Sequence, residues 1–246
     1  MKTYKLMTSE IINTKEIGHI IEVYEEVAAT KMQRIRADIL VSRDFFDGLM
    51  KVSEDVGLDL ENLKLEKARR EAAVFVSANT GLYGDIVSKT FSLFMDYLKD
   101  KDPDIFVIGK LGSEMLKKTL PGKRFETVEI SDEKIEMDKF SAVNKVLMNY
   151  EKISVFYGRF GSIVNQYSHA SVISGEIVKE YQKGKTWDKR KNKTSLKYFY
   201  EPDVKKVSEF FGNEILTATF EAMLRESQLA KFGSRLMYLD MAIDST

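Results

Sequence analysis

Hydrophobic residues recur at three- and four-residue steps in two long stretches, one at each end of the chain. The first predicts a helix over residues 15–52, without a proline and with Asn13 or Thr14 as its N-cap. Its apolar stripe consists of Ile17, Ile20, Ile21, Tyr24, Val27, Ala28, Ile35 and Ile39. Such a helix would be about 55 Å long, more than the width of the domain this chain could build. We therefore expect part of it to need another partner.

The second stretch begins after Pro202 and still has the helical pattern at Thr246. A proline near the first turn is typical of a helix start. The apolar stripe consists of Val204, Val207, Phe211, Ile215, Thr219, Met223, Leu229, Phe232, Leu236, Leu239 and Ile243. Two long, apolar-striped helices at distant ends of one chain predict an antiparallel coiled coil.

Between the two helices, short apolar runs alternate with helical patterns. Predicted strands cover residues 72–78, 105–108, 124–130 and 152–160, and predicted helices cover 86–98, 113–118 and 138–150. A polar connection at 56–65 precedes them, and edge strands are expected at 172–181 and 195–200. Such alternation favours a Rossmann-like, mostly parallel sheet, so the predicted fold class is α/β. We expect residues 66–200 to form the globular domain, flanked by coiled-coil helices in 1–60 and 201–246.

Composition describes an ordinary folded protein and excludes several classes of site. Of 246 residues, 43% are hydrophobic, and 38 basic residues balance 38 acidic ones, which argues against disorder. The chain has no cysteine, so it has no disulfide or thiolate chemistry, and two histidines alone make a structural zinc site improbable. No apolar run approaches the ~20 residues of a membrane span, and no signal peptide is recognisable. We expect no metal and no cofactor.

Three glycine- or lysine-rich segments are candidates for ligand binding. The turn at residues 81–84 follows a predicted strand and could place N–H groups around a phosphate, but we favour a structural turn, because glycine permits tight strand-to-helix turns. Residues 184–186 resemble the end of a P-loop without its first glycine. The basic segment 183–197 surrounds Trp187 and could hold single-stranded nucleic acid or be a solvated hairpin tip. His19 and His169 are isolated, and no catalytic residues are expected.

Six segments, in the same order along the chain, resemble motifs of the ATP synthase gamma subunit. Residues 27–34 (VAATKMQR) resemble V-A-A-x-K-(L/M)-x-R, and 77–84 (SANTGLYG) resemble T-S-D-(R/K)-G-L-C-G. Residues 106–112 resemble V-I-G-(K/R)-(K/R)-G, 157–166 match Y-x-x-F-x-S-x-x-x-Q, and 200–202 match (F/Y)-E-P. Residues 226–244 resemble the family's last motif, E-(S/N)-x-A-S-E-x-A-A-R-M and onward. Together these motifs span almost the whole chain.

The resemblance implies the central rotor stalk of an F-type ATP synthase. In that family the terminal helices form a shaft inside a hexamer of alpha and beta subunits, and the α/β domain contacts epsilon and the membrane rotor ring. Rotation of the shaft couples ion translocation to ATP synthesis or hydrolysis. The resemblance further implies no active site of its own, and a peripheral position on the cytoplasmic face of the bacterial plasma membrane.

The resemblance also suggests interface residues and alternatives. Lys31 and Arg34 on the first helix, and Arg225, Glu226 and Arg235 on the last, are expected to face the hexamer. The family's last helix continues beyond the position of Thr246, so this helix is expected to be short. One alternative is a gamma-like subunit of a specialised F-like ATPase that does not make ATP. Another is an α/β protein that binds a nucleotide or nucleic acid.

Overall fold

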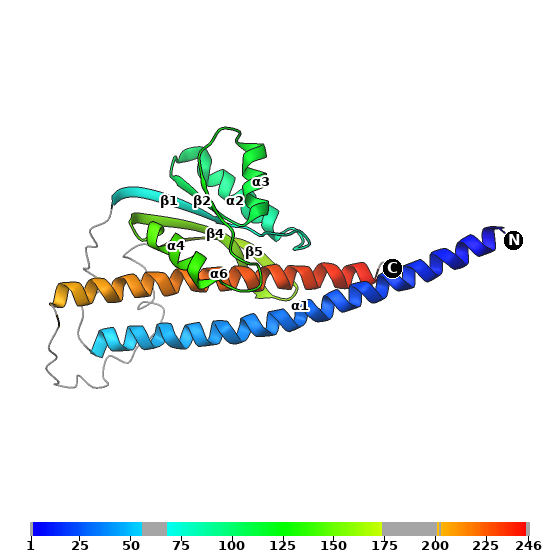
Figure 1. Ribbon diagram of the computed structural model, residues 1–246, viewed down its shortest axis with the longest axis horizontal. Coiled ribbons are helices and arrows are strands. Elements are labelled where there is room, and N and C mark those ends of the chain that lie inside the picture. The colour runs from blue at the N-terminus through cyan, green and yellow to red at the C-terminus, as the bar shows by residue number, and fades with distance from the viewer. Residues whose placement is uncertain (1, 56–67, 174–200, 202, 245–246) are drawn as a thin grey trace.

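The computed structural model describes the chain except for residues 1, 56–67, 174–200, 202 and 245–246. Two long helices, α1 (Lys2–Asp55) and α6 (Val204–Asp244), lie side by side and run antiparallel beneath the sheet domain (Figure 1). With 54 residues, α1 is about 80 Å long. No helix among the described residues is both long enough and apolar enough to cross a membrane.

The first helix begins earlier than its sequence predicts. Helix α1 starts at Lys2, so the predicted start near residue 15, with a cap at Asn13 or Thr14, is wrong. Residues 2–14 contain no glycine or proline, so nothing interrupts the helix there. A residue that could cap a helix does not start one when the residues before it are also helix-compatible.

The face of α1 that packs against α6 is a heptad seam. Buried and half-buried positions alternate in steps of three and four residues, through Thr14, Gly18, Ile21, Glu25, Ala28, Met32, Ile35, Ile39, Ser42 and Phe46. The predicted stripe is therefore partly wrong, because four of its members, Ile17, Ile20, Tyr24 and Val27, are 43–57% exposed. The stripe merged two neighbouring apolar rows, and periodicity alone does not tell which row faces the partner.

A five-stranded, mostly parallel sheet forms the centre of the α/β domain, which confirms the predicted fold class. Its order is β3 (Glu126–Val128), β2 (Asp104–Ile108), β1 (Ala68–Val76), β4 (Tyr150–Ser162) and β5 (Asn165–Ile173). The first four strands are parallel, and β5 pairs antiparallel with β4. The connecting helices are α2 (Ile86–Asp100), α3 (Lys110–Thr119) and α4 (Met137–Leu147).

The edge of the sheet differs from the prediction. The strand after β4 is Asn165–Ile173, so a strand starting at residue 172 is wrong in its start. Strand β5 was missed because most of its residues are polar or small, as its exposed edge position permits. The remainder of 172–181, the predicted strand at 195–200 and the connection at 56–65 lie outside the described residues.

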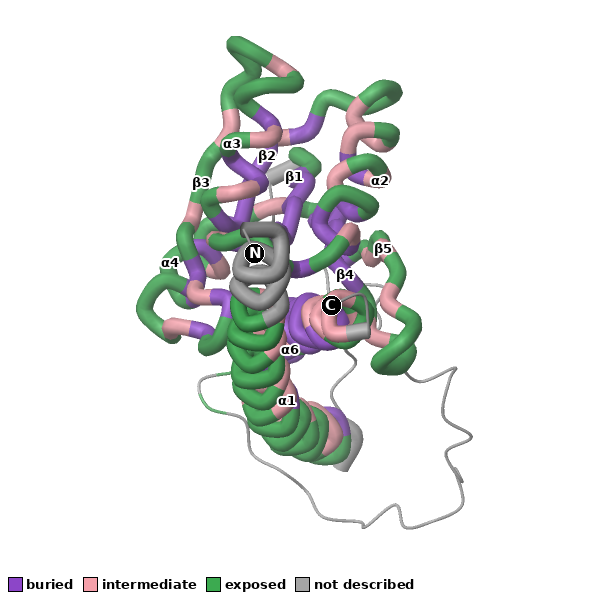
Figure 2. The backbone as a smooth tube through the Cα atoms, turned by 90° about the vertical axis from the view of Figure 1, so that its right-hand side faces the viewer, coloured by how far each residue is buried: buried purple, intermediate pink, exposed green. Residues whose placement is uncertain are grey.

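Helix α6 is part of the core on both faces of the sheet. Helix α4 packs on one face, together with Leu216 and Phe220 of α6. Helices α2 and α3 pack on the other face, where Leu229 and Phe232 of α6 join Met32 of α1. Figure 2 shows the consequence, because α6 is largely buried whereas most of α1 is exposed. The last helix is thus held by the domain, and the first helix is held mainly by the last.

Candidate functional site

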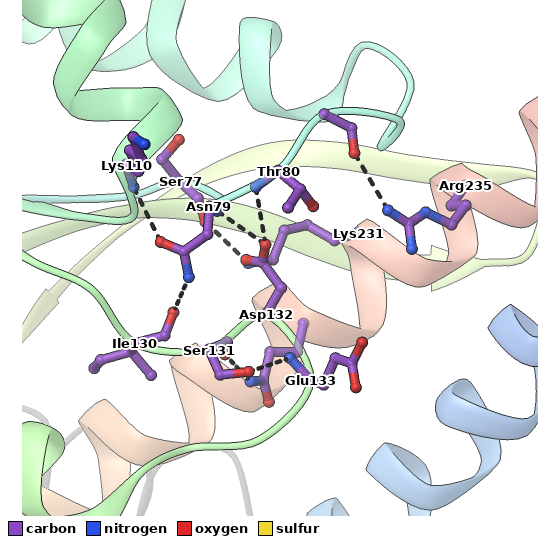
Figure 3. A network of polar contacts seen from close by, with 12 residues as sticks. Ser77, Asn79, Thr80, Lys110, Ile130, Ser131, Asp132, Glu133, Lys231 and Arg235 are labelled. Carbon is purple, nitrogen blue, oxygen red and sulfur yellow. Dashed lines mark hydrogen bonds and ion pairs between the residues drawn. The ribbon is translucent and has the colours of Figure 1, made fainter.

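The surface that joins the helical pair to the α/β domain carries a polar network (Figure 3). It lies where α6 passes the turn after β1 and the loop after β3. Because β1, β2 and β3 are parallel neighbours, the segments after these strands meet at one edge of the sheet. Polar side chains of α6 reach this edge, so it is where the helical pair is fixed to the domain by directed contacts.

A buried ion pair occupies the centre of the network. The ammonium of Lys231 donates to Asp132 Oδ1 at 2.6 Å and to the carbonyl oxygen of Ser77 at 2.9 Å. The two charged side chains are only 6% and 7% exposed. Burial lowers the pKa of Lys231, and the neighbouring carboxylate of Asp132 opposes that change. Charges so deeply buried are tolerated only when they are paired and hydrogen-bonded, as both are here.

The other oxygen of Asp132 binds the turn after β1. Its Oδ2 accepts the backbone N–H of Asn79 at 2.9 Å and that of Thr80 at 3.3 Å. The side chain of Asn79 continues the network, donating to the carbonyl oxygen of Ile130 and accepting the N–H of Lys110. Two N–H groups just before the candidate turn at 81–84 are thus directed at a carboxylate of the same chain. The cavity beside Lys231 measures about 10 Å³, far below the ~300 Å³ or more of a ligand pocket.

Arg235 holds the glycine turn against α6. Its guanidinium donates to the carbonyl oxygens of Leu82 at 3.0 Å and Gly81 at 3.2 Å, and lies 4.2 Å from the ring centroid of Tyr83. Burial, with a smaller contribution from the charge of Asp132, raises the pKa of Tyr83 to about 12. The turn at 81–84 is therefore part of the packing between helix and domain, which agrees with its structural interpretation.

Further ion pairs connect α1 to the rest of the molecule. Lys31 pairs with Glu133 in the loop after β3, and its ammonium lies 5.9 Å from the ring centroid of Phe232. Arg225 of α6 binds Asp38 of α1 at 3.1 Å and Glu221 of its own helix at 2.6 Å. These pairs are more exposed than Lys231 and Asp132, so water and salt screen them more strongly.

The residues predicted from the sequence fall on this junction and around it. Lys31, Arg225 and Arg235 make the contacts described above, and Glu226 pairs with Arg159 of β4 at 3.2 Å. Arg34 is exposed on α1. The structure thus brings Lys31 and Arg235 to the same junction. Arg225, Glu226 and Arg34 lie apart from it.

Sequence reasoning missed the central members of the network, Lys231, Asp132 and Gln228. Gln228 donates to the carbonyl oxygen of Ser131 at 3.0 Å. A weak signal existed, because polar residues 228, 231 and 235 recur at helical spacing between apolar positions of the last helix. Within the described residues, no group of three acidic or histidine side chains is placed to hold a metal ion. The basic segment 183–197 and the P-loop-like residues 184–186 lie outside the described part of the chain.

Comparison with known proteins agrees with the arrangement of a helical pair fixed to an α/β domain. The ATP synthase gamma chain of Paracoccus denitrificans is 24% identical over 98% of this chain and 87% of its own length. That of Christiangramia forsetii is 24% identical over the whole of this chain and 87% of its own length. The central stalk in the Tetrahymena thermophila mitochondrial ATP synthase shares the fold, with a TM-score of 0.63 at 15% identity, covering 91% of this chain and 99% of that one. The sequence profile of the ATP synthase family matches residues 3–246, and the chain therefore belongs to that family, alongside these gamma chains.

Proposed function

We propose that this chain is the central rotor stalk, the gamma subunit, of an F-type ATP synthase. In this role it couples ion translocation to ATP synthesis or hydrolysis by rotating within a hexamer of alpha and beta subunits. The observation that carries the proposal is the family match over residues 3–246, joined to a fold in which a long antiparallel helical pair is anchored in an α/β domain.

The coupling has a simple physical basis. A shaft without threefold symmetry makes different contacts with each of three equivalent catalytic sites. A partner that contacts one conformation of a site more favourably than another shifts the population and the nucleotide affinity of that site. The chain itself is non-catalytic in this proposal. It contributes contacts that differ among the three catalytic sites, and it takes part in no chemical step.

The proposed partners differ between the two long helices and the α/β domain. We propose that the alpha and beta subunits surround the helices in residues 1–60 and 201–246, and that epsilon and the membrane rotor ring contact the domain in 66–200. The complex would sit peripherally on the cytoplasmic face of the bacterial plasma membrane. An exposed row of large apolar residues on α1 supports a protein partner there: Ile12, Ile17, Ile20, Val23 and Tyr24 are each 51–60% exposed.

The five candidate interface residues are not equally placed for this role. Arg34 is exposed and can meet another subunit without breaking a contact described above. Lys31, Arg225, Glu226 and Arg235 are engaged in ion pairs or carbonyl contacts inside the chain. We propose Arg34 as a direct contact with the hexamer. For the other four residues, we propose that contact with the hexamer depends on how firmly their bonds inside the chain hold the helices in place.

Co-expression with alpha and beta subunits tests the proposal. The expected product is a hexamer carrying one copy of this chain, with ATP hydrolysis that differs from that of the hexamer alone. Absence of the chain from the purified hexamer would overturn the proposal. A complete complex that hydrolyses ATP but does not make it under an imposed ion gradient would favour the specialised F-like ATPase.

A further inference from the structure

Helix α6 must resist being turned or slid along the domain if it transmits torque. Most of its surface against the sheet is small or apolar, including Ala230, Phe232 and Gly233. Apolar contacts stabilise the buried helix but do not by themselves fix its rotation, because the hydrophobic effect depends on the buried area and not on orientation. The side chains of a helix also repeat every turn, about 5.4 Å along its axis, so a shifted helix can regain much of the same burial.

Lys231 differs from these apolar residues, because its contacts exist in one register only. Gln228 and Arg235 of α6 also bond to the domain, but Gln228 carries no charge and the Arg235 contacts are exposed. The ammonium of Lys231 lies 2.6 Å from a carboxylate oxygen in the loop after β3 and 2.9 Å from a carbonyl oxygen at the end of β1. A roll or slide of α6 would move the charge away from both acceptors into apolar surroundings. The cost of an unpaired buried charge exceeds that of losing an exposed pair by a wide margin.

The acceptor side is equally fixed. Asp132 is held by the N–H groups of Asn79 and Thr80, and Asn79 in turn accepts the first N–H of α3 from Lys110. The contact chain therefore runs from α6 through two loops into a helix of the α/β domain, as Figure 3 shows for its labelled members. A force on Lys231 is transmitted to the domain rather than absorbed by a loose side chain.

We propose that the Lys231–Asp132 pair fixes the rotational register of α6 in the α/β domain, as a positioning pair for torque transmission. The inference rests on the proposed function, since register under load matters only to a shaft. It predicts that removing both charges leaves a folded subunit whose two parts slip when loaded.

The experiment compares three variants in the complete membrane complex, reconstituted in vesicles. Lys231→Met leaves Asp132 buried without its partner. Asp132→Asn with Lys231→Met removes both charges and keeps an acceptor for the turn. Lys99→Met with Asp96→Asn is the matched control, because it removes an exposed ion pair from α2 with the same two substitutions. ATP hydrolysis and ATP-driven ion uptake are measured in the same vesicles.

The double charge removal decides the question, because no lone buried charge remains to unfold the subunit. We expect this variant to assemble and hydrolyse ATP while losing ion uptake, with the α2 control equal to wild type in both. Ion uptake per ATP equal to wild type would overturn the inference, and so would failure of this variant to assemble when the control does. If the wild-type chain itself shows no coupled uptake, the proposed function fails before the inference is reached.

Discussion

Gly84 is the residue that allows the close approach between α6 and the turn after β1. Its φ is +56°, and a Cβ there would lie 2.2 Å from the ring of Tyr238 and 2.5 Å from Ser234 Oγ. Gly81, three residues earlier, has no atom within 4 Å of its Cβ position. Gly84 therefore meets both a conformational and a steric requirement, and Gly81 meets neither.

We expect Gly84→Ala to lower the free energy of unfolding by about 2–4 kcal/mol, through left-handed strain and overpacking. Gly81→Ala is expected to change it by less than about 1 kcal/mol. Urea unfolding of the full chain, followed by circular dichroism, measures both. Equal midpoints for the two variants would contradict the close contact with α6.

Ionisation of Tyr83 makes the free energy of unfolding depend on pH in the alkaline range. Its folded pKa of about 12 exceeds the ordinary value of 10.0 because the phenol is buried, only 3% exposed, near Asp132. Between these values the unfolded chain loses the phenolic proton while the folded chain keeps it. The unfolded state then binds fewer protons, so stability falls as pH rises from 10 to about 12.

We expect this residue to contribute a loss of about 2–3 kcal/mol across that range. Tyr83→Phe removes the titrating group, so its unfolding free energy should decline less steeply than that of the wild type above pH 10. Urea midpoints at half-unit intervals from pH 8 to 11.5 compare the two slopes. Parallel slopes would mean that the phenol ionises as easily in the folded chain as in the unfolded one.

The residues at the junction show where sequence reasoning ends. The family motifs pointed to Arg235 and Lys31 as residues that face the hexamer, not as members of this junction, and the turn at 81–84 was interpreted from its glycines. Lys231 and Asp132 were not predicted, since they are 99 residues apart and a local pattern does not pair distant charges. Their burial follows from the position of α6 between α1 and the sheet, which is a property of the tertiary structure.

Long periodic elements could be predicted well, and short or exposed ones poorly. Helix α6 begins close to its predicted start, and the four parallel strands overlap their predicted ranges. Apolar runs such as those of β1 and β2 indicate strands buried on both faces. The edge strand β5 lacks that signal, and the start of α1 has no breaker to indicate it. The residues of the α1 seam could be identified only once the position of α6 was known.

The seam and the neighbouring exposed row predict mutational effects of different size within one helix. Ile35 is 2% exposed against α6 and the domain, and Ile20 is 57% exposed. We expect Ile35→Ala to cost about 2–5 kcal/mol and Ile20→Ala less than about 1 kcal/mol. Thermal unfolding of the two full-length variants provides the measurement. A similar loss at Ile20 would place that residue in a buried contact and contradict the heptad seam.

Among the described residues, more large apolar side chains are exposed on the two long helices than on the α/β domain. The N-terminal end of α1 projects past the C-terminal end of α6 (Figure 1). The exposed apolar row of α1 includes Ile12, Ile17, Ile20 and Val23. Exposed rows of this kind mark interaction surfaces and cause association when the partner is missing.

We therefore expect the purified chain to self-associate as its concentration rises. Ile17→Glu with Ile20→Glu should shift the association to higher concentration, because both apolar side chains are removed from the exposed row. Thr30→Glu with Gln33→Glu adds the same charge at exposed polar positions and is the control. Sedimentation velocity over a concentration series compares the three chains. Equal dissociation by both pairs would assign the effect to charge repulsion alone.

The antiparallel pairing of the first helix with the last has a consequence for biosynthesis. The seam of α1 leaves the ribosome before the residues of α6 that cover it, which begin at Val204. At about 5–20 residues per second, this interval lasts on the order of ten seconds or more. During that time the apolar positions of the α1 seam lack their partner, while the sheet domain is still being completed. Nascent chains of this protein thus carry their most association-prone surface first, and chaperone capture should concentrate on the first fifty residues.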